Sequence, residues 1–122
     1  MAKILVVDDE QTIVETIVEL LTWDGHTVLS ASNGQRALEI LASERPDVML
    51  LDFMMPLKDG IETLRSIRST AAIASVPVVF MTAAPMSIPA NAPRYDLLLV
   101  KPFNAQVLRD AIQAMLRAHP PG

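Results

Sequence analysis

The sequence KILVVDD at residues 3–9 joins a short apolar run to two aspartates. An uninterrupted aliphatic run such as 4–7 is typical of a strand that is buried on both faces of a parallel sheet. Residues 10–23 then repeat apolar side chains at helical spacing, and Gly25 follows as a stop signal. The beginning of the chain therefore predicts a buried strand followed by a helix.

The same alternation continues along the rest of the chain. Further strands are predicted at 26–31, 48–51, 76–81 and 97–100, where Pro77 is compatible with the start of a strand. Further helices are predicted from Gly34 to before Pro46, over 60–69, and after Asn104, a favourable N-cap residue; 53–59 is predicted as a loop. This pattern indicates an α/β fold, a doubly wound five-stranded parallel sheet with the flavodoxin-like strand order 2-1-3-4-5.

The fourth crossover departs from this pattern because it is rich in proline. Pro85 is compatible with the first turn of a helix, but Pro89 and Pro93 would each remove a backbone donor and clash with the preceding turn. We therefore predict that the fourth helix is missing or reduced to about one turn. The segment would then form a mobile loop over the carboxyl ends of the strands.

Composition limits the classes of function. With 122 residues, 51% hydrophobic and 20% charged, the chain suits one folded domain, predicted at 1–118, with a tail or the first residues of a linker at 119–122. The absence of cysteine excludes disulfides, thiolate metal sites and a cysteine nucleophile, and two histidines cannot form a His-rich metal site.

Charge and hydropathy predict the environment of the chain. No apolar stretch approaches the ~20 residues of a membrane span, and residues 1–9 do not resemble a signal peptide, so we expect a cytoplasmic protein without membrane association. The net charge of −4 argues against direct binding to nucleic acid.

Chemically active side chains follow the predicted strands. Asp8 and Asp9 follow the first strand, Asp52 the third, Thr82 the fourth and Lys101 the fifth. Because ligands of this architecture bind at the carboxyl ends of the strands, we expect these side chains to converge. Individually, the aspartates could cap a helix or form a turn, Thr82 could cap a strand end, and Lys101 could be a solvated charge.

Together, these residues favour phosphoryl transfer. Crowded carboxylates with oxygen donors suit Mg²⁺ or Mn²⁺, and one carboxylate can remain free to attack phosphorus. The hydroxyl of Thr82 and the ammonium of Lys101 can bind phosphoryl oxygens. The set therefore supplies the positioning and charge stabilisation that this reaction needs.

Four motifs resemble the receiver domain of two-component response regulators, in particular the single-domain regulators of the chemotaxis type. They are 3–9 (KILVVDD), 52–60 (DFMMPLKDG), 81–83 (MTA) and 100–103 (VKPF). The resemblance covers essentially the whole chain, and the order and spacing of the motifs make it specific.

The resemblance implies a phosphoacceptor role for Asp52, with a phosphohistidine on a sensor histidine kinase or a histidine phosphotransfer protein as the donor. It implies Mg²⁺ on Asp9, Asp52 and the carbonyl of Met54, with Asp8 assisting through water. It places Thr82 and Lys101 on the phosphoryl oxygens. It also implies a cis peptide before Pro102, an unidentified downstream protein partner, and no enzyme activity beyond the domain's own phosphorylation and slow dephosphorylation.

The chain departs from the family pattern at a position that usually couples phosphorylation to an output surface. Receivers usually carry an aromatic residue three positions before the lysine, where this chain has Leu98; the nearest upstream aromatic is Tyr95. We expect Leu98 to stay inward. The alternative function is therefore a receiver-fold interaction module that switches weakly or not at all on phosphorylation.

Two other families use related chemistry or folds. A phosphatase of the haloacid dehalogenase type needs a second aspartate two residues after the nucleophile, where this chain has Met54. A flavodoxin needs hydroxyls and amides in its phosphate loop, where this chain has acidic residues 8–10. Both assignments are therefore disfavoured.

Overall fold

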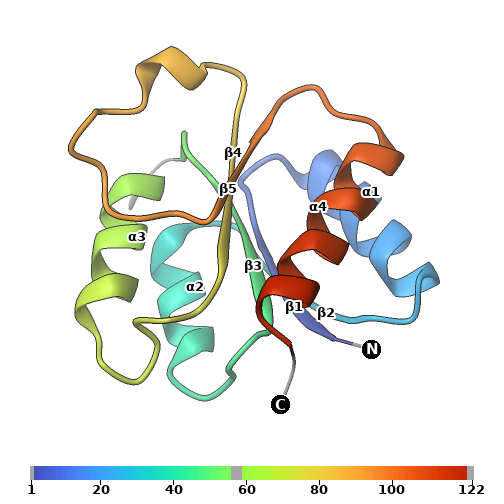
Figure 1. Ribbon diagram of the computed structural model, residues 1–122, viewed down its shortest axis with the longest axis horizontal. Coiled ribbons are helices and arrows are strands. Elements are labelled where there is room, and N and C mark those ends of the chain that lie inside the picture. The colour runs from blue at the N-terminus through green and yellow to red at the C-terminus, as the bar shows by residue number, and fades with distance from the viewer. Residues whose placement is uncertain (1, 56–58, 121–122) are drawn as a thin grey trace.

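Five parallel strands form one sheet in the order β2-β1-β3-β4-β5 in the computed structural model, which describes residues 2–55 and 59–120 (Figure 1). The strands are β1 (Lys3–Val7), β2 (Thr27–Ala31), β3 (Val48–Asp52), β4 (Val78–Thr82) and β5 (Leu97–Val100). The helices are α1 (Gln11–Trp23), α2 (Gly34–Leu41), α3 (Gly60–Ser69) and α4 (Ala105–Ala118), with a single turn of 3₁₀ helix, η1 (Pro85–Ser87). The predicted fold class and strand order are confirmed.

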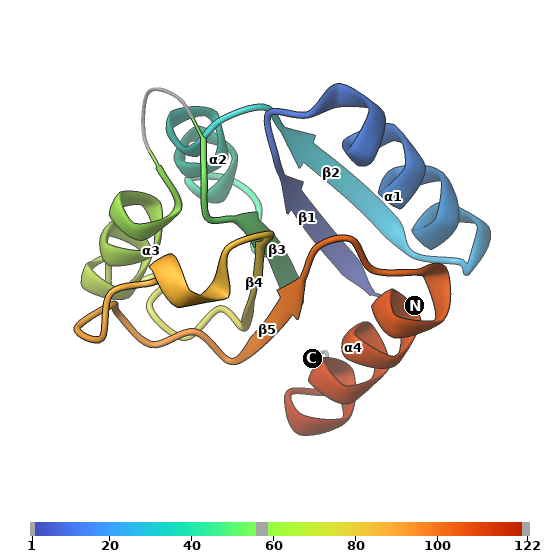
Figure 2. The ribbon, with the colours of Figure 1, turned by 90° about the horizontal axis from the view of Figure 1, so that it is seen from above.

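The helices cover both faces of the sheet (Figure 2). Helices α1 and α4 lie on one face and α2 and α3 on the other. The central strands β1, β3 and β4 therefore face apolar side chains on both sides, and Ile4, Leu50 and Phe80 are completely buried. Continuous apolar runs in the sequence are a consequence of this two-sided burial.

Local sequence signals fix the ends of the helices. Gly25 has φ 94° and ends α1, because the amide of His26 donates to the carbonyl of Leu21 and the amide of Gly25 donates to that of Thr22. The side chains of Asn33 and Asn104 accept hydrogen bonds from backbone amides in the first turns of α2 and α4. The predicted cap at Asn104 and the stop signal at Gly25 are confirmed.

The strand boundaries differ from the sequence prediction by one or two residues. Strand β4 begins at Val78 rather than at residue 76, because Pro77 has no amide proton to donate, although its carbonyl accepts a bond from Met49. Strand β3 extends through Asp52, which pairs in register with Met81. Within the loop predicted at 53–59, residues 56–58 lie outside the described part of the chain, as do residues 121–122 of the predicted tail.

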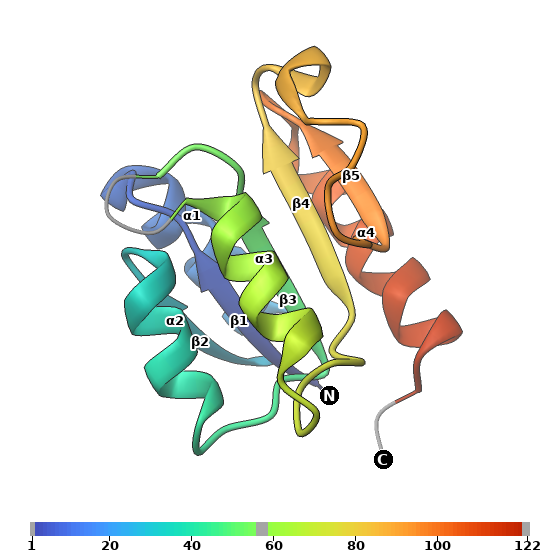
Figure 3. The ribbon, with the colours of Figure 1, turned by 90° about the vertical axis from the view of Figure 1, so that its left-hand side faces the viewer.

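The fourth crossover contains only the single turn η1, as Figure 3 shows beside the full helices. The prediction that the crossover between β4 and β5 contains no helix, or only about one turn, is confirmed. Pro89 and Pro93 explain it, because proline cannot occupy a helix interior. Ile88 and Tyr95 from this loop pack against the same apolar cluster as α2 and α3, and the ring of Tyr95 lies 5.2 Å from that of Phe80. The loop therefore covers the part of the sheet that a helix between β4 and β5 would cover.

A polar cluster anchors the far end of this loop. The guanidinium of Arg68, in the last turn of α3, donates to the backbone carbonyls of Ala74, Val76 and Arg94. It also pairs with the carboxylate of Asp96, at 3.2 Å, and that carboxylate accepts a bond from the amide of Val78. One side chain thus ties α3 to the beginnings of β4 and β5.

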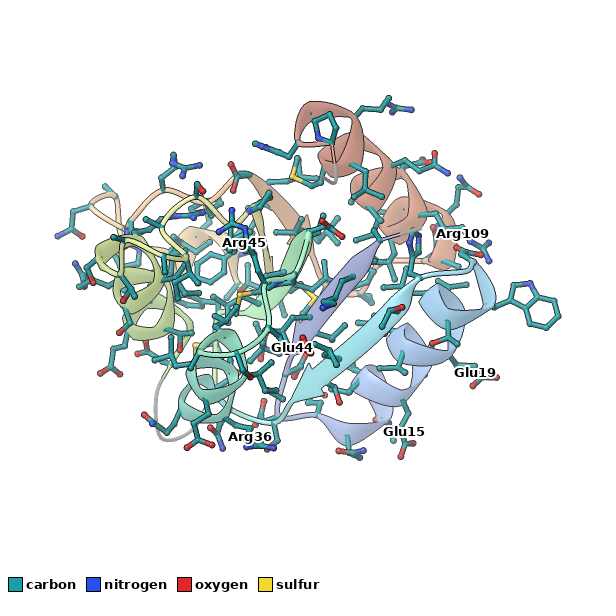
Figure 4. All side chains as sticks on the ribbon, turned by 90° about the horizontal axis from the view of Figure 1, so that it is seen from below. Glu15, Glu19, Arg36, Glu44, Arg45 and Arg109 are labelled. Carbon is teal, nitrogen blue, oxygen red and sulfur yellow. The ribbon has the colours of Figure 1, made fainter. Side chains whose placement is uncertain are left out.

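Most charged side chains lie on the outside. Glu15 and Glu19 project from α1 and Arg36 projects from α2, away from the sheet (Figure 4). Within the described residues, no helix is both long and apolar enough to cross a membrane. The buried charges at the carboxyl ends of the strands are exceptions to this outward placement of charged side chains.

We expect Arg68→Met to lower the free energy of unfolding by about 2 kcal/mol, because it removes a donor from three backbone carbonyls and one of the two arginines that pair with the poorly exposed carboxylate of Asp96. The matched control is Arg36→Met, because Arg36 is 62% exposed in its pair with Glu39 and should contribute less than about 0.5 kcal/mol. Chemical denaturation measures both. Equal destabilisation by the two variants would contradict the anchoring role of Arg68.

Candidate functional site

The carboxyl ends of four neighbouring strands meet at one edge of the sheet. In register, Val7 of β1 pairs with Leu51 of β3, so Asp8 follows directly beside Asp52. Thr82 of β4 pairs with Val100 of β5, and the amide of Lys101, one position further along, donates to the carbonyl of Thr82 at 2.8 Å. The structure therefore brings together the side chains that sequence analysis placed after separate strands.

Three carboxylates form a compact cluster at this edge. Asp8, Asp9 and Asp52 each place one carboxylate oxygen within 4.8 Å of the others. Asp8 is 1% exposed and Asp52 is 4% exposed, whereas Asp9 faces solvent. Because like charges this close repel each other, the cluster needs a compensating cation.

The ammonium group of Lys101 supplies part of that compensation. Its Nζ lies 2.8 Å from Oδ2 of Asp8 and 3.1 Å from Oδ1 of Asp52. The side chain of Glu10 approaches the same ammonium at 3.6 Å from the solvent side. Sequence analysis did not assign Glu10 to the site; its position directly after Asp9 was the only available signal.

The pKa values reflect this balance. Burial, followed by the neighbouring charge of Asp8, raises the pKa of Asp52 to about 6, against the opposing effect of Lys101. Burial alone would lower the pKa of Lys101, but its hydrogen bond to Asp8 and its contact with Asp52 raise it above the usual value. Lys101 therefore stays protonated, and the charge of Asp52 is the unfavourable one.

Thr82 and Met54 complete the predicted set. Thr82 is 1% exposed, and its Oγ1 accepts a hydrogen bond from the amide of Ala84, the residue that precedes η1. Met54 lies two residues after Asp52 on the loop between β3 and α3, and its side chain is 66% exposed. The peptide before Pro102 is cis, as the resemblance implied.

The individual alternatives account for only part of the geometry: the Thr82 hydroxyl does accept a bond at the end of β4, but Lys101 is not a solvated charge. Glu10 occupies the N-cap position of α1, but no side-chain capping bond forms there. Asp8 does accept a bond from the amide of Glu10, yet its second oxygen contacts Lys101. The hydrogen bond from the Glu10 amide and the ion pair with Lys101 therefore use different oxygens of the Asp8 carboxylate.

The donor set fits a hard divalent cation. Its side-chain donors are carboxylate oxygens from three residues, and cysteine and histidine ligands are absent from the cluster. Such oxygen donors match the preference of Mg²⁺ or Mn²⁺, which keep several waters when a protein binds them through few carboxylates.

Comparison with known proteins identifies the family. The family model for the response regulator receiver domain matches residues 4–113 of this chain. The chain belongs to the receiver domain family of response regulators. This result decides against the flavodoxin and haloacid dehalogenase alternatives.

Curated relatives are longer than this chain. The receiver is 39% identical to the response regulator MprA of Mycobacterium ulcerans over 121 residues, which cover 94% of this chain and 50% of that protein. It is 37% identical to MprA of Mycobacterium leprae over 98% of this chain and 53% of that protein. The chain thus spans about half the length of these relatives.

Solved structures match the receiver over nearly their full length. The chemotaxis response regulator CheY4 of Vibrio cholerae is 30% identical, with a TM-score of 0.88, over 95% of this chain and 99% of that one. The receiver domain of the sensor histidine kinase PA1611 of Pseudomonas aeruginosa is 25% identical, with a TM-score of 0.88, over 95% and 98% of the two chains. That structure contains a magnesium ion coordinated in its active site cleft.

We expect Asp52→Asn to raise the metal-free free energy of unfolding by about 1 kcal/mol at neutral pH, because it removes one of the repelling carboxylates. Asp110→Asn is the matched control: it makes the same change in net charge on an exposed part of α4, outside the cluster. Thermal melting in a chelator measures both. A melting temperature of Asp52→Asn at or below that of the wild type would show that repulsion does not dominate the site.

Proposed function

We propose that this receiver accepts a phosphoryl group on Asp52 from a phosphohistidine of a sensor histidine kinase or a histidine phosphotransfer protein. The observation that supports this most directly is the position of Asp52, a buried carboxylate with Asp8 and Asp9 beside it and the Lys101 ammonium at 3.1 Å. An oxygen of Asp52 attacks phosphorus, the bond from phosphorus to the imidazole nitrogen breaks, and the leaving imidazole keeps that electron pair.

The other residues of the site have distinct roles in this proposal. Lys101 neutralises one phosphoryl oxygen, and the hydroxyl of Thr82 donates to another. Asp8, Asp9, Asp52 and the carbonyl of Met54 would hold Mg²⁺, with Mn²⁺ as an alternative ion. When bound, the cation supplies neutralisation of the negative charge shared by the carboxylates and the phosphoryl group.

Several further properties follow from this proposal. The domain, assigned to residues 1–118, would catalyse only its own phosphorylation and slow dephosphorylation, and would act on an unidentified downstream protein. It would work in the cytoplasm and would not itself contact nucleic acid, consistent with the net charge of −4.

A second candidate is a receiver-fold interaction module with weak or absent switching. The observations that favour it are the single turn η1 in the fourth crossover and the aliphatic side chain of Leu98, which is half-buried and packs into the cluster on the α3 side. A change of surface on phosphorylation needs two packings of similar energy, and Leu98 has no polar group that favours an exposed one.

Incubation with Mg²⁺ and acetyl phosphate should add one acid-stable, base-labile phosphate to the wild type at Asp52, which lies beside Lys101 and the other acids, whereas both oxygens of Asp8 already accept hydrogen bonds, from the Glu10 amide and from Lys101. Intact-mass measurement and peptide mapping in acid would locate it. Asp52→Asn should abolish labelling, Asp9→Asn should slow it by weakening cation binding, and Asp110→Asn should label normally. Wild-type labelling of Asp52→Asn would exclude the assignment.

The phosphoryl group should be long-lived by receiver standards. Met54 and Ala84 stand two residues after Asp52 and Thr82, and neither can orient an attacking water by a strong hydrogen bond. Met54→Glu should speed decay about tenfold, which is about 1.4 kcal/mol in activation free energy. Met54→Leu should not change it. Equal decay rates in the Glu and Leu variants would contradict the explanation that the wild type lacks a group to orient the attacking water.

Phosphorylation should act on the loop of residues 83–95. The hydroxyl of Thr82 accepts a hydrogen bond from the amide of Ala84, so once it also donates to a phosphoryl oxygen it should hold the start of η1 against the site. Hydrogen exchange with and without beryllofluoride should show a gain of protection mainly at 83–95, with α2 unchanged. Thr82→Val should lose this response. Identical exchange at 83–95 in both states would favour the interaction module that does not switch.

A further inference from the structure

Gly60, the first residue of α3, lies against the backbone that carries Asp52. Its amide donates to the carbonyl of Phe53 at 3.1 Å, and the residue is buried. The first turn of α3 therefore rests on the chain segment directly after the proposed phosphoacceptor.

The close approach leaves no room for a side chain. A Cβ atom at residue 60 would lie 2.4 Å from the carbonyl oxygen of Asp52 and 2.8 Å from the Cα of Phe53. It would also lie 2.9 Å from Cε1 of the Phe80 ring. Among the described residues, the glycine with positive φ is Gly25, so Gly60 is required for space and not for backbone conformation.

Both sides of this contact are held in place. Asp52 pairs with Met81 in the β3–β4 ladder, and the amide of Phe53 donates to the carbonyl of Met81 at 2.9 Å. On the other side, Asp59 and Glu62 form a reciprocal capping box at the start of α3. Leu64 and Ile67 of α3 are completely buried. A side chain at residue 60 cannot therefore be accommodated by a free movement of either element.

Phe80 makes the third contact equally rigid. Its ring is completely buried and lies 5.7 Å from the ring of Phe53 in an edge-to-face arrangement and 5.2 Å from the ring of Tyr95. Close-packed rings of this kind transmit a displacement instead of absorbing it. A Cβ at residue 60 would thus push on the backbone of Asp52 and on the ring that supports Phe53.

We propose that Gly60 is a positioning residue for phosphorylation: by letting α3 dock against the backbone of Asp52, it sets where the Asp52 carboxylate stands relative to Asp8, Asp9 and Lys101. This inference rests on the proposed function of Asp52. Because Cβ atoms essentially never come closer than 3.0 Å to such atoms, a methyl group at residue 60 must displace its neighbours by at least about 0.6 Å. Displacements approaching ~1 Å can cost about a hundredfold in rate when reacting groups must be aligned.

The test compares Gly60→Ala with Leu64→Ala. Both change α3, but Leu64 lies one turn beyond Gly60 and packs into the apolar cluster. The labelling rate with acetyl phosphate at saturating Mg²⁺ is measured per folded molecule, with the folded fraction taken from circular dichroism. Calorimetric titration with Mg²⁺ alone gives a second measurement that does not depend on phosphorylation.

Gly60→Ala should label roughly tenfold to a hundredfold more slowly and bind Mg²⁺ more weakly. Leu64→Ala should lose as much thermal stability or more, yet keep the wild-type rate and Mg²⁺ affinity per folded molecule. A folded Gly60→Ala protein with the wild-type rate and affinity would overturn the proposal. So would an equal loss of rate in Leu64→Ala, since that would make the effect one of stability.

Two further measurements cover the cases in which the wild type is not labelled or Gly60→Ala does not fold. If the wild type is not labelled, the proposed function fails, and the Mg²⁺ titration still decides whether Gly60 positions the carboxylates. If Gly60→Ala does not fold, Phe80→Leu can be added to relieve one of the three contacts, with Phe80→Leu alone as the control. The double variant should still label slowly, because the contact with the Asp52 carbonyl remains; a rate equal to its control would overturn the proposal.

Discussion

The Lys101 ammonium lies between two buried carboxylates, and the organisation of the site depends on this contact. Its Nζ lies 2.8 Å from Asp8 and 3.1 Å from Asp52, so one cation from the end of β5 compensates acids from the ends of β1 and β3. A single lysine cannot neutralise three carboxylates, and the pKa of Asp52 is raised to about 6, first by burial and then by the charge of Asp8, despite the opposing effect of Lys101. In the proposed function, that imbalance of charge favours the binding of a divalent cation and then of a phosphoryl group at this edge of the sheet.

The rest of the fold serves to keep this arrangement rigid. Two-sided burial of β1, β3 and β4 fixes the register of the strands from which Asp8, Asp52 and Thr82 emerge. The close contact of Gly60 fixes the loop segment that follows Asp52. At the opposite end of the sheet, Arg68 ties the beginnings of β4 and β5 to α3. The site is therefore held by the sheet and by α3, while the fourth crossover is free to differ from the other crossovers.

That crossover is where this receiver differs most from a regular βα repeat. Its segment retains one turn, η1, and covers the sheet with Ile88 and Tyr95 instead of with a helix. The Thr82 hydroxyl contacts the amide of Ala84 at the start of this loop, which gives the proposed phosphorylation site a direct connection to it. A signal that reaches this surface would act on a loop and not on the packing of a helix.

The sequence by itself determined the class of the fold, the five polar side chains that follow the strands at one edge of the sheet, and the reduction of the fourth crossover to a single turn. These follow from local causes: apolar runs, capping residues such as Asn104, and prolines that cannot occupy a helix interior. Only the tertiary structure decided which charges meet, since the 2.8 Å contact between Lys101 and Asp8 joins residues 93 positions apart. It also decided the approach of Glu10 to Lys101 and the spatial role of Gly60, because close approach depends on how α3 docks on β3, and no local pattern specifies that docking.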